Sequence, residues 1–214
     1  MAFSFKNLYL GKTIDMSEKL QQAFERFDAY NKNDPNRFTW KGQDYPQEYF
    51  LALKLHEWVR KLDPQASQQL LLASRSQHIG RWESPRKNYP MDRSGYLLWR
   101  KELAQHHATT AGKILRELGY DETTMLATQQ IILKRKIKVE ADVQTMENAL
   151  CLVFLQFQYA DFFPKHEDKI VDILRKSLLK MDAHGHQFAL QLPYSEAGLA
   201  HIQAALALLA AKGQ

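Results

Sequence analysis

The chain has 214 residues, 45% of them hydrophobic and 25% charged, which suits one soluble globular domain. Nine glycines and seven prolines are few, which disfavours both a disordered chain and a turn-rich all-β fold. The formal net charge of +5 suits an anionic partner, such as a nucleotide, a phosphorylated metabolite or RNA, but is also typical of a basic surface without such a partner.

Apolar residues recur at steps of three and four along most of the chain, which predicts an all-α fold. The expected helices cover residues 17–31, 47–62, 65–78, 94–118, 121 to the basic run at 134, 143–161, 166–181 and 195–211. A turn-rich segment, NKNDPNRFTWKGQDYP, follows the first helix, and strand-like alternation is almost absent. No repeat or linker divides the sequence, so we expect a single domain over residues 1–214.

No segment indicates export or membrane insertion. The N-terminal segment lacks a basic region followed by a long apolar core, and no apolar run reaches the ~18 residues that span a bilayer. The single cysteine, Cys151, lies in an apolar run, so one chain forms neither a disulfide framework nor a cysteine-based zinc site. We therefore expect a cytoplasmic protein that does not enter a membrane.

The most informative segment is SRSQHIGRWESPRKNYPMDRSGYLLWR, residues 74–100. A predicted helix ends near His78, and the connector that follows is long, basic and aromatic, whereas most helical proteins join their helices with short polar loops. We interpret this connector as a site rather than a spacer. The candidates for binding phosphate or stacking a base are Arg75, Arg81, Trp82, Arg86, Tyr89, Arg100 and Lys136. Lys136 lies in the run KRKIK, which is also typical of a solvated helix end.

Glu48 is expected to face the protein interior. The predicted helix 47–62 has an apolar stripe at helical spacing, formed by Leu51, Leu55, Trp58 and Leu62. Glu48 continues this stripe one turn earlier. A first-turn glutamate favoured by the helix dipole would occupy the same position, so the sequence leaves both roles open.

Two histidines are candidates for the same interior. His107 falls in line with Leu103 and Ile114 on its predicted helix, whereas the adjacent His106 points about 100° away. His78 ends the helix before the connector. Each also has a structural explanation, because core histidines are usually hydrogen-bonded and helix-end histidines bond terminal carbonyls.

These residues suggest a metal site. Glu147 lies near the start of the predicted helix 143–161, which is apolar nearly all round and should be central. With Glu48, His78 and His107 it would supply two carboxylates and two histidines from four helices, a set that suits a divalent ion. No HxxxH or CxxC spacing marks this site, and we find no P-loop, Rossmann fingerprint or GxSxG motif.

Four segments resemble an uncharacterised conserved family of bacteria and fungi that is known as a domain of unknown function. They are DAYNKNDPN, QHIGRWESPRKNYPMDRSGYLLWR, HHATTAGKILRELGYDE and QTMENALCLVFLQFQYADF. The resemblance covers roughly residues 16–192, which leaves an N-terminal extension at 1–15 and a C-terminal helix at about 195–211. It implies no activity.

More loosely, the order of helices and polar residues is similar to the HD superfamily of metal-dependent phosphohydrolases. This resemblance implies a single-domain, HD-like helical fold with the basic, aromatic loop after its third helix. Glu48 would stand at the first ligand position, Gln77-His78 at the His-Asp pair, and Glu147 or Asn148 near the last ligand. Gln77 and Glu147 are then the catalytic candidates, although Gln77 is a poor ligand where the superfamily carries a histidine.

Two hypotheses on function follow. The first is an HD-like phosphohydrolase, with or without a divalent metal ion of unknown identity, that acts on a nucleotide or a small phosphorylated metabolite. The second is a non-catalytic module on the same fold that binds a nucleotide or RNA. A helical scaffold whose loop is merely structural is the third alternative.

Overall fold

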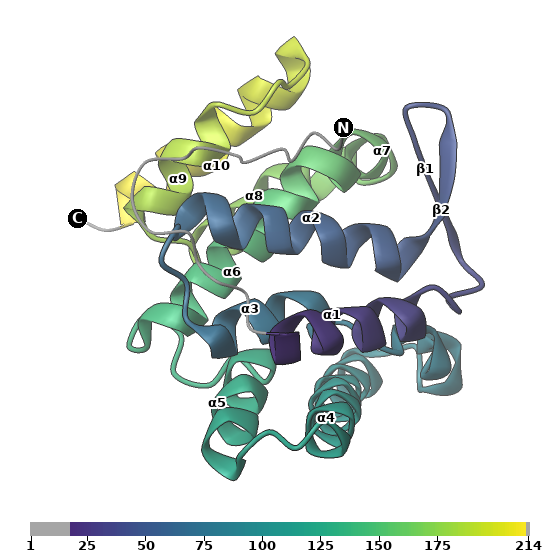
Figure 1. The fold of residues 1–214 in the computed structure, drawn as a ribbon. Helices are drawn as coiled ribbons and strands as arrows, with labels where there is room; N and C mark the ends of the chain where they lie inside the picture. The colour runs from purple at the N-terminus through teal and green to yellow at the C-terminus, as the bar shows by residue number, and fades with distance from the viewer. Residues whose placement is uncertain (1–17, 213–214) are drawn as a thin grey trace, which may run out of the picture.

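The computed structural model describes residues 18–212, and most of this range is helical (Figure 1). The helices are α1 (Glu18–Asn31), α2 (Gln47–Leu62), α3 (Gln68–Ser76), α4 (Arg93–Glu117), α5 (Glu122–Ile132), α6 (Ala141–Val153), α7 (Tyr159–Phe162), α8 (Ile170–Leu178), α9 (Ala183–Leu190) and α10 (Glu196–Lys212). Two short strands, β1 (Arg37–Trp40) and β2 (Gln43–Pro46), form a hairpin. The predicted all-α fold is confirmed, and the expected N-terminal extension lies outside the described residues.

The core lies around α2, which packs against α3 on one side and α6 on another. In Figure 1, α2 crosses the middle of the molecule, α4 and α5 lie below it, and α8, α9 and α10 lie above. Large side chains that are fully buried include Phe27, Leu70, Leu72, Met146 and Leu152. Each contributes about 2 kcal/mol by leaving water. None of the described helices is both long and apolar enough to cross a membrane.

The hairpin lies where the sequence predicts only turns. Its two strands pair antiparallel across Lys41 and Gly42, which both have positive φ. A two-residue turn of this kind matches the right-handed twist of paired strands. Phe38 packs on Phe50 of α2 with ring centroids 4.8 Å apart, so the hairpin covers the first turns of that helix. Alternation over four residues is too short to be recognised as a strand.

The C-terminal half departs from the predicted helices at three places. The expected helix 143–161 is interrupted by a π-helical turn, Phe154–Gln158. The expected helix 166–181 begins at Ile170, after two 3-10 turns, Phe163–Lys165 and Glu167–Lys169. Helix α9 is missing from the sequence-based prediction, because two turns of helix give too few residues for a clear period.

The connector after α3 is compact. Gly80 has a φ of 69°, and a Cβ at this position would lie 2.7 Å from His106 Nε2, so glycine is required there. Two 3-10 turns follow, Arg81–Glu83 and Arg86–Asn88. Trp99 Nε1 on α4 donates a hydrogen bond of 2.9 Å to the Ser84 carbonyl, which holds the connector against α4.

Candidate functional site

The end of α3, one face of α4 and the end of α5 enclose a cavity of about 550 Å³, which we name the basic pocket. Its lining consists of Gln77, His78, Arg81, residues 100–105, His107 and residues 132–135. Of the residues predicted for a site, Gln77, His78, Arg81, Arg100 and His107 therefore come together here. The segments that supply them are far apart in the sequence.

Five basic side chains line the basic pocket: Arg81, Arg100, Lys101, Lys134 and Arg135. Arg100 and Arg135 are exposed, and no carboxylate of residues 18–212 forms an ion pair with either. Lys134 is partly neutralised, because its Nζ lies 2.8 Å from Glu147 Oε2. The excess of positive charge favours an anionic ligand.

The histidines at the basic pocket are held neutral. His107 is 2% exposed, and its Nδ1 lies 2.7 Å from the Ile79 carbonyl, to which it donates when the ring is neutral. Burial, together with the charge of Arg81, lowers the pKa of His107 to about 3, although the bond to Ile79 opposes this shift. Burial and Arg81 also lower the pKa of His78 well below its usual range. The pocket thus owes its positive charge to arginine and lysine.

Gln77 joins two helices at the inner wall of the basic pocket. The side chain is 3% exposed, and its Nε2 donates a hydrogen bond of 2.9 Å to the carbonyl of Ile132, the last residue of α5. This bond satisfies a helix-end carbonyl. Within the described range, Gln77 Oε1 and His107 Nε2 are buried without a hydrogen-bond partner.

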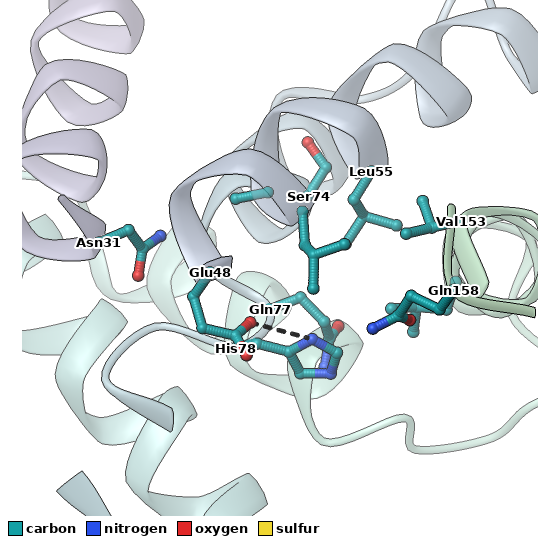
Figure 2. Close-up of a pocket in the computed structure, with 11 residues that line it drawn as sticks. Asn31, Glu48, Leu55, Ser74, Gln77, His78, Val153 and Gln158 are labelled. Carbon is teal, nitrogen blue, oxygen red and sulfur yellow. Dashed lines mark ion pairs between the residues drawn. The ribbon is translucent and has the colours of Figure 1, made fainter. Parts of the chain in front are cut away.

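Glu48 lies behind His78, beside a smaller cavity of about 50 Å³ that we name the inner cavity. Figure 2 shows its carboxylate facing the His78 ring, with Gln158 of the π-helical turn pointing toward the same place. Glu48 Oε2 is 3.8 Å from His78 Nδ1, and Oε1 is 3.7 Å from Arg81 Nε. π-Helical turns often occur at functional sites, and no feature of the sequence predicted this one.

Replacing Glu48 by Gln is expected to remove part of the pH dependence of stability. Burial raises the pKa of Glu48 from its usual 4.5 to about 7, because Arg81 offsets only some of the cost of burying the charge. The folded state therefore binds a proton more tightly, so this contribution is full below about pH 4.5 and is lost as the pH rises through about 7. Between about pH 4 and pH 8, the free energy of unfolding of the wild type should fall by up to about 3 kcal/mol relative to that of the variant. Urea denaturation across this range tests the prediction, and parallel curves would contradict it.

Asp34 fixes the start of α2 and, with it, the position of Glu48. Its carboxylate accepts hydrogen bonds of 2.9 Å from the backbone N–H of Glu48 and of Asn36, and one of 2.8 Å from the Asn36 amide. The residue before α2 is Pro46, which has no side-chain acceptor, so Asp34 satisfies a helix N-terminal donor from a distance.

Replacing Asp34 by Ala is expected to lower the free energy of unfolding by about 2 kcal/mol, because buried donors lose their acceptor. Urea denaturation measures this loss. The matched control is Asp63→Ala at the other end of α2, where the carboxylate accepts one bond of 2.9 Å from Gln65 N. The control should lose less than about 1 kcal/mol. Equal losses in both variants would count against this role of Asp34.

A second hollow, of about 340 Å³, lies on the other side of Arg81, and we name it the aromatic pocket. Two of the predicted binding residues, Trp82 and Arg86, line it together with Trp99 and Lys87. Arg81 lines both pockets. Its guanidinium carbon lies 5.8 Å from the centre of the Trp99 ring.

Three of the predicted phosphate- or base-binding residues do not line either pocket. Arg75 forms an ion pair with Asp28 of α1. Tyr89 donates a hydrogen bond of 2.7 Å to Glu102 Oε2. Lys136 Nζ lies 3.0 Å from Glu140 Oε1, on the exposed surface. Arg75 and Tyr89 thus hold neighbouring elements together, and Lys134 and Arg135 take the place expected for Lys136.

Glu147 does not join the other three predicted metal ligands. It is 2% exposed, with Oε2 at 2.8 Å from Lys134 Nζ and Oε1 at 3.7 Å from Lys180 Nζ. Burial would raise the pKa of Glu147, but these two lysines lower it below its usual value. The neighbouring Asn148 bonds Asp182, which caps α9. Glu147 and Asn148 therefore join α6 to Lys134, to Lys180 and to the start of α9.

The remaining residues do not fit the predicted metal site. Glu48, His78 and His107 are neighbours, with the two histidine rings 5.6 Å apart, but the Arg81 guanidinium stands beside Glu48. Throughout residues 18–212, no three His, Cys, Asp or Glu side chains are arranged to hold a metal ion.

Comparison with known proteins identifies a family. Residues 21–202 match the model of a family described as a domain of unknown function, DUF4202. The chain belongs to this family. No curated protein and no solved structure matches the chain. The DUF4202 match runs from within α1 to within α10, so it includes every residue of the basic and aromatic pockets.

Proposed function

We propose that the basic pocket binds a small molecule that carries a phosphate group. The observation that supports this most directly is the pair Arg100 and Arg135, which face the pocket without a carboxylate partner in residues 18–212. Guanidinium groups bind phosphate through two parallel N–H bonds. A phosphate would supply the missing counter-charge, with Lys134 at the same rim.

Two buried atoms at the inner wall favour a ligand that also carries hydroxyl groups. His107 Nε2 and Gln77 Oε1 have no hydrogen-bond partner in the described part of the chain, although buried polar atoms normally have one. Both accept hydrogen bonds when the histidine is neutral. The hydroxyl groups of a sugar phosphate or a nucleotide would reach them once a small side-chain movement exposes these atoms to the pocket.

Hydrolysis of the phosphate ester is the second candidate function. It is favoured by the position of Glu48, whose carboxylate faces His78 across the inner cavity (Figure 2), because His78 also lines the basic pocket. His78 would accept a proton from the water that attacks phosphorus as the ester P–O bond breaks, and Glu48 would stabilise the imidazolium, which then returns the proton to the leaving alkoxide. Arg81 and Arg100 would neutralise charge that develops on the phosphoryl oxygens. This would be an HD-like phosphohydrolase whose steps use the chain's own residues.

Binding ranks above hydrolysis because of the charge around His78. Burial and the cations Arg81 and Lys134 lower its pKa, which makes it a weak base. A bound phosphate dianion would oppose this effect, since a nearby negative charge stabilises imidazolium. The order of the two candidates therefore depends on the electrostatics of the complex.

Isothermal titration calorimetry with inorganic phosphate and ribose 5-phosphate tests the proposal. We expect binding of ribose 5-phosphate that weakens as salt is added. No binding of either compound at about 10 mM, well above a 1 mM dissociation constant, would overturn it. Tighter binding of a single-stranded RNA oligonucleotide than of ribose 5-phosphate would also overturn it, in favour of an RNA-binding module.

A phosphate-release assay on the same compounds separates hydrolysis from binding. Release that requires His78 and persists without added Mn²⁺ would support the second candidate. Binding of the compounds without phosphate release would support the first candidate, binding without hydrolysis. Phosphate release only in the presence of Mn²⁺ would contradict a hydrolytic step that uses the chain's own side chains alone.

A further inference from the structure

The aromatic pocket is a second cavity that phosphate binding leaves without a role. It adjoins the basic pocket, because Arg81 lines both and because Trp99 and Arg100 are consecutive residues of α4 that line one pocket each. A ligand whose phosphate lies on Arg100 would therefore extend past Arg81 toward the Trp99 ring. The question is which chemistry suits that second space.

Two half-buried tryptophans give the aromatic pocket flat apolar surfaces. Trp99 is held by its hydrogen bond to the Ser84 carbonyl, 2.9 Å long, and Trp82 lies 5.9 Å from the Tyr30 ring. The Trp99 ring is thus held by its hydrogen bond and needs little ordering when a planar group stacks on it, and Trp82 adds a second aromatic surface beside Tyr30. Planar heterocycles stack on tryptophan, whereas the hydroxylated face of a sugar gains less from such a surface.

The charged side chains that line the aromatic pocket are three basic ones, Arg81, Arg86 and Lys87, and the carboxylate of Glu48. Arg86 is anchored by bonds of 3.0 Å and 3.2 Å to the carbonyls of Tyr89 and Asp92, so its guanidinium forms part of a fixed wall. Lys87 lies beside it. Cationic groups beside aromatic rings suit the carbonyl and ring-nitrogen acceptors of a nucleobase.

We propose that the ligand is a nucleotide, with its base in the aromatic pocket, its phosphate in the basic pocket and Arg81 between them. This inference rests on the proposed function and names the class of molecule that the same site takes. The assignment depends on the juxtaposition of the two pockets across one arginine. A sugar phosphate would fill only the basic pocket.

Calorimetry with adenosine 5′-monophosphate and ribose 5-phosphate, which differ by the base, tests the inference on the full chain. We expect wild type to bind adenosine 5′-monophosphate at least about tenfold more tightly. Trp82→Leu should reduce this ratio while leaving ribose 5-phosphate affinity within about twofold, and Trp99→Leu, which also removes the ring beside Arg81, should reduce the ratio as well. Trp40→Leu, in the hairpin and away from both pockets, is the matched control and should keep the wild-type ratio.

The outcomes separate the inference from the proposed function. If both compounds bind wild type equally well, the aromatic pocket does not take the base and the inference falls, while phosphate binding stands. If neither compound binds, the proposed function fails and the inference fails with it. A wild-type preference for adenosine 5′-monophosphate that both Trp82→Leu and Trp99→Leu keep would also overturn the inference, and urea denaturation of each variant shows that it is folded.

Discussion

The double variant Arg100→Glu/Arg135→Glu is expected to bind ribose 5-phosphate at least about 100-fold more weakly than wild type. Each arginine would contribute a charge-assisted hydrogen bond of about 1.5–3 kcal/mol, and glutamate adds repulsion to that loss. Both side chains are exposed and have no ion-pair partner within residues 18–212. The free energy of unfolding of the double variant should therefore fall by less than about 1 kcal/mol. Calorimetry and urea denaturation measure the two effects separately.

The matched control for this variant is Arg116→Glu/Lys138→Glu. These exposed residues lie on the same helix and in the same segment as Arg100 and Arg135 but line neither pocket. The control has the same net charge, so any general electrostatic effect on phosphate is equal in both proteins. Comparable weakening in both double variants would contradict a local role for Arg100 and Arg135.

Replacing Glu147 by Gln is expected to lower the free energy of unfolding by about 3 kcal/mol at neutral pH, while phosphate binding is kept or improved. The carboxylate is buried and holds Lys134 and Lys180, so its neutral replacement leaves Lys134 without its counter-charge. Lys134 would then offer its full charge to the basic pocket. A catalytic or metal-binding role for Glu147 predicts the opposite pattern, with stability kept and function lost.

The stability difference between Glu147→Gln and wild type depends on pH, because the pKa of Glu147 is lowered in the folded protein. The two lysines hold the pKa of Glu147 below its usual value of 4.5 in the folded protein. Its contribution to stability is therefore present above about pH 4.5 and is lost as the pH falls through the folded-state pKa. Wild type and Glu147→Gln should converge in urea denaturation toward low pH. Glu140→Gln, which removes an exposed pair with Lys136, is the control and should change stability by less than about 1 kcal/mol.

Periodicity alone predicted which polar residues face inward. Glu48 continues the apolar stripe of α2 and is 3% exposed, and His107 continues that of α4 and is 2% exposed. Both follow from the 3.6-residue repeat, because residues three or four apart lie on one face. The C-terminal helix α10 is confirmed on the same basis. The roles proposed for Glu48 and His107 stay predictions.

The partners of these residues were not predictable, because they depend on how the helices pack. Arg75 lies close to His78 in sequence, but it belongs to α3 itself, whose face is covered by α1 and its Asp28. Glu147 was correctly placed on a buried helix, yet nothing in the sequence indicates that Lys134 and Lys180 reach it. Ion pairs between distant segments leave no local pattern.

The turn after α5 shows a further limit of local reasoning. The sequence singles out Lys136, but Lys134 and Arg135 line the basic pocket. Lys134, Lys136 and Lys138 all have positive φ, which is uncommon for lysine and reverses the chain direction after the helix. Lysine is not typical of a turn with positive φ. The direction of each side chain in the run KRKIK, residues 134–138, could therefore not be predicted from the sequence.

A crystal structure of the protein grown with saturating ribose 5-phosphate tests the central claim most directly. We expect electron density for the phosphate in the basic pocket, with its oxygens on the guanidinium groups of Arg100 and Arg135 and with Lys134 nearby. A phosphate bound elsewhere on the chain would contradict it. So would a basic pocket without phosphate in crystals grown from a solution in which calorimetry shows the binding to be saturated.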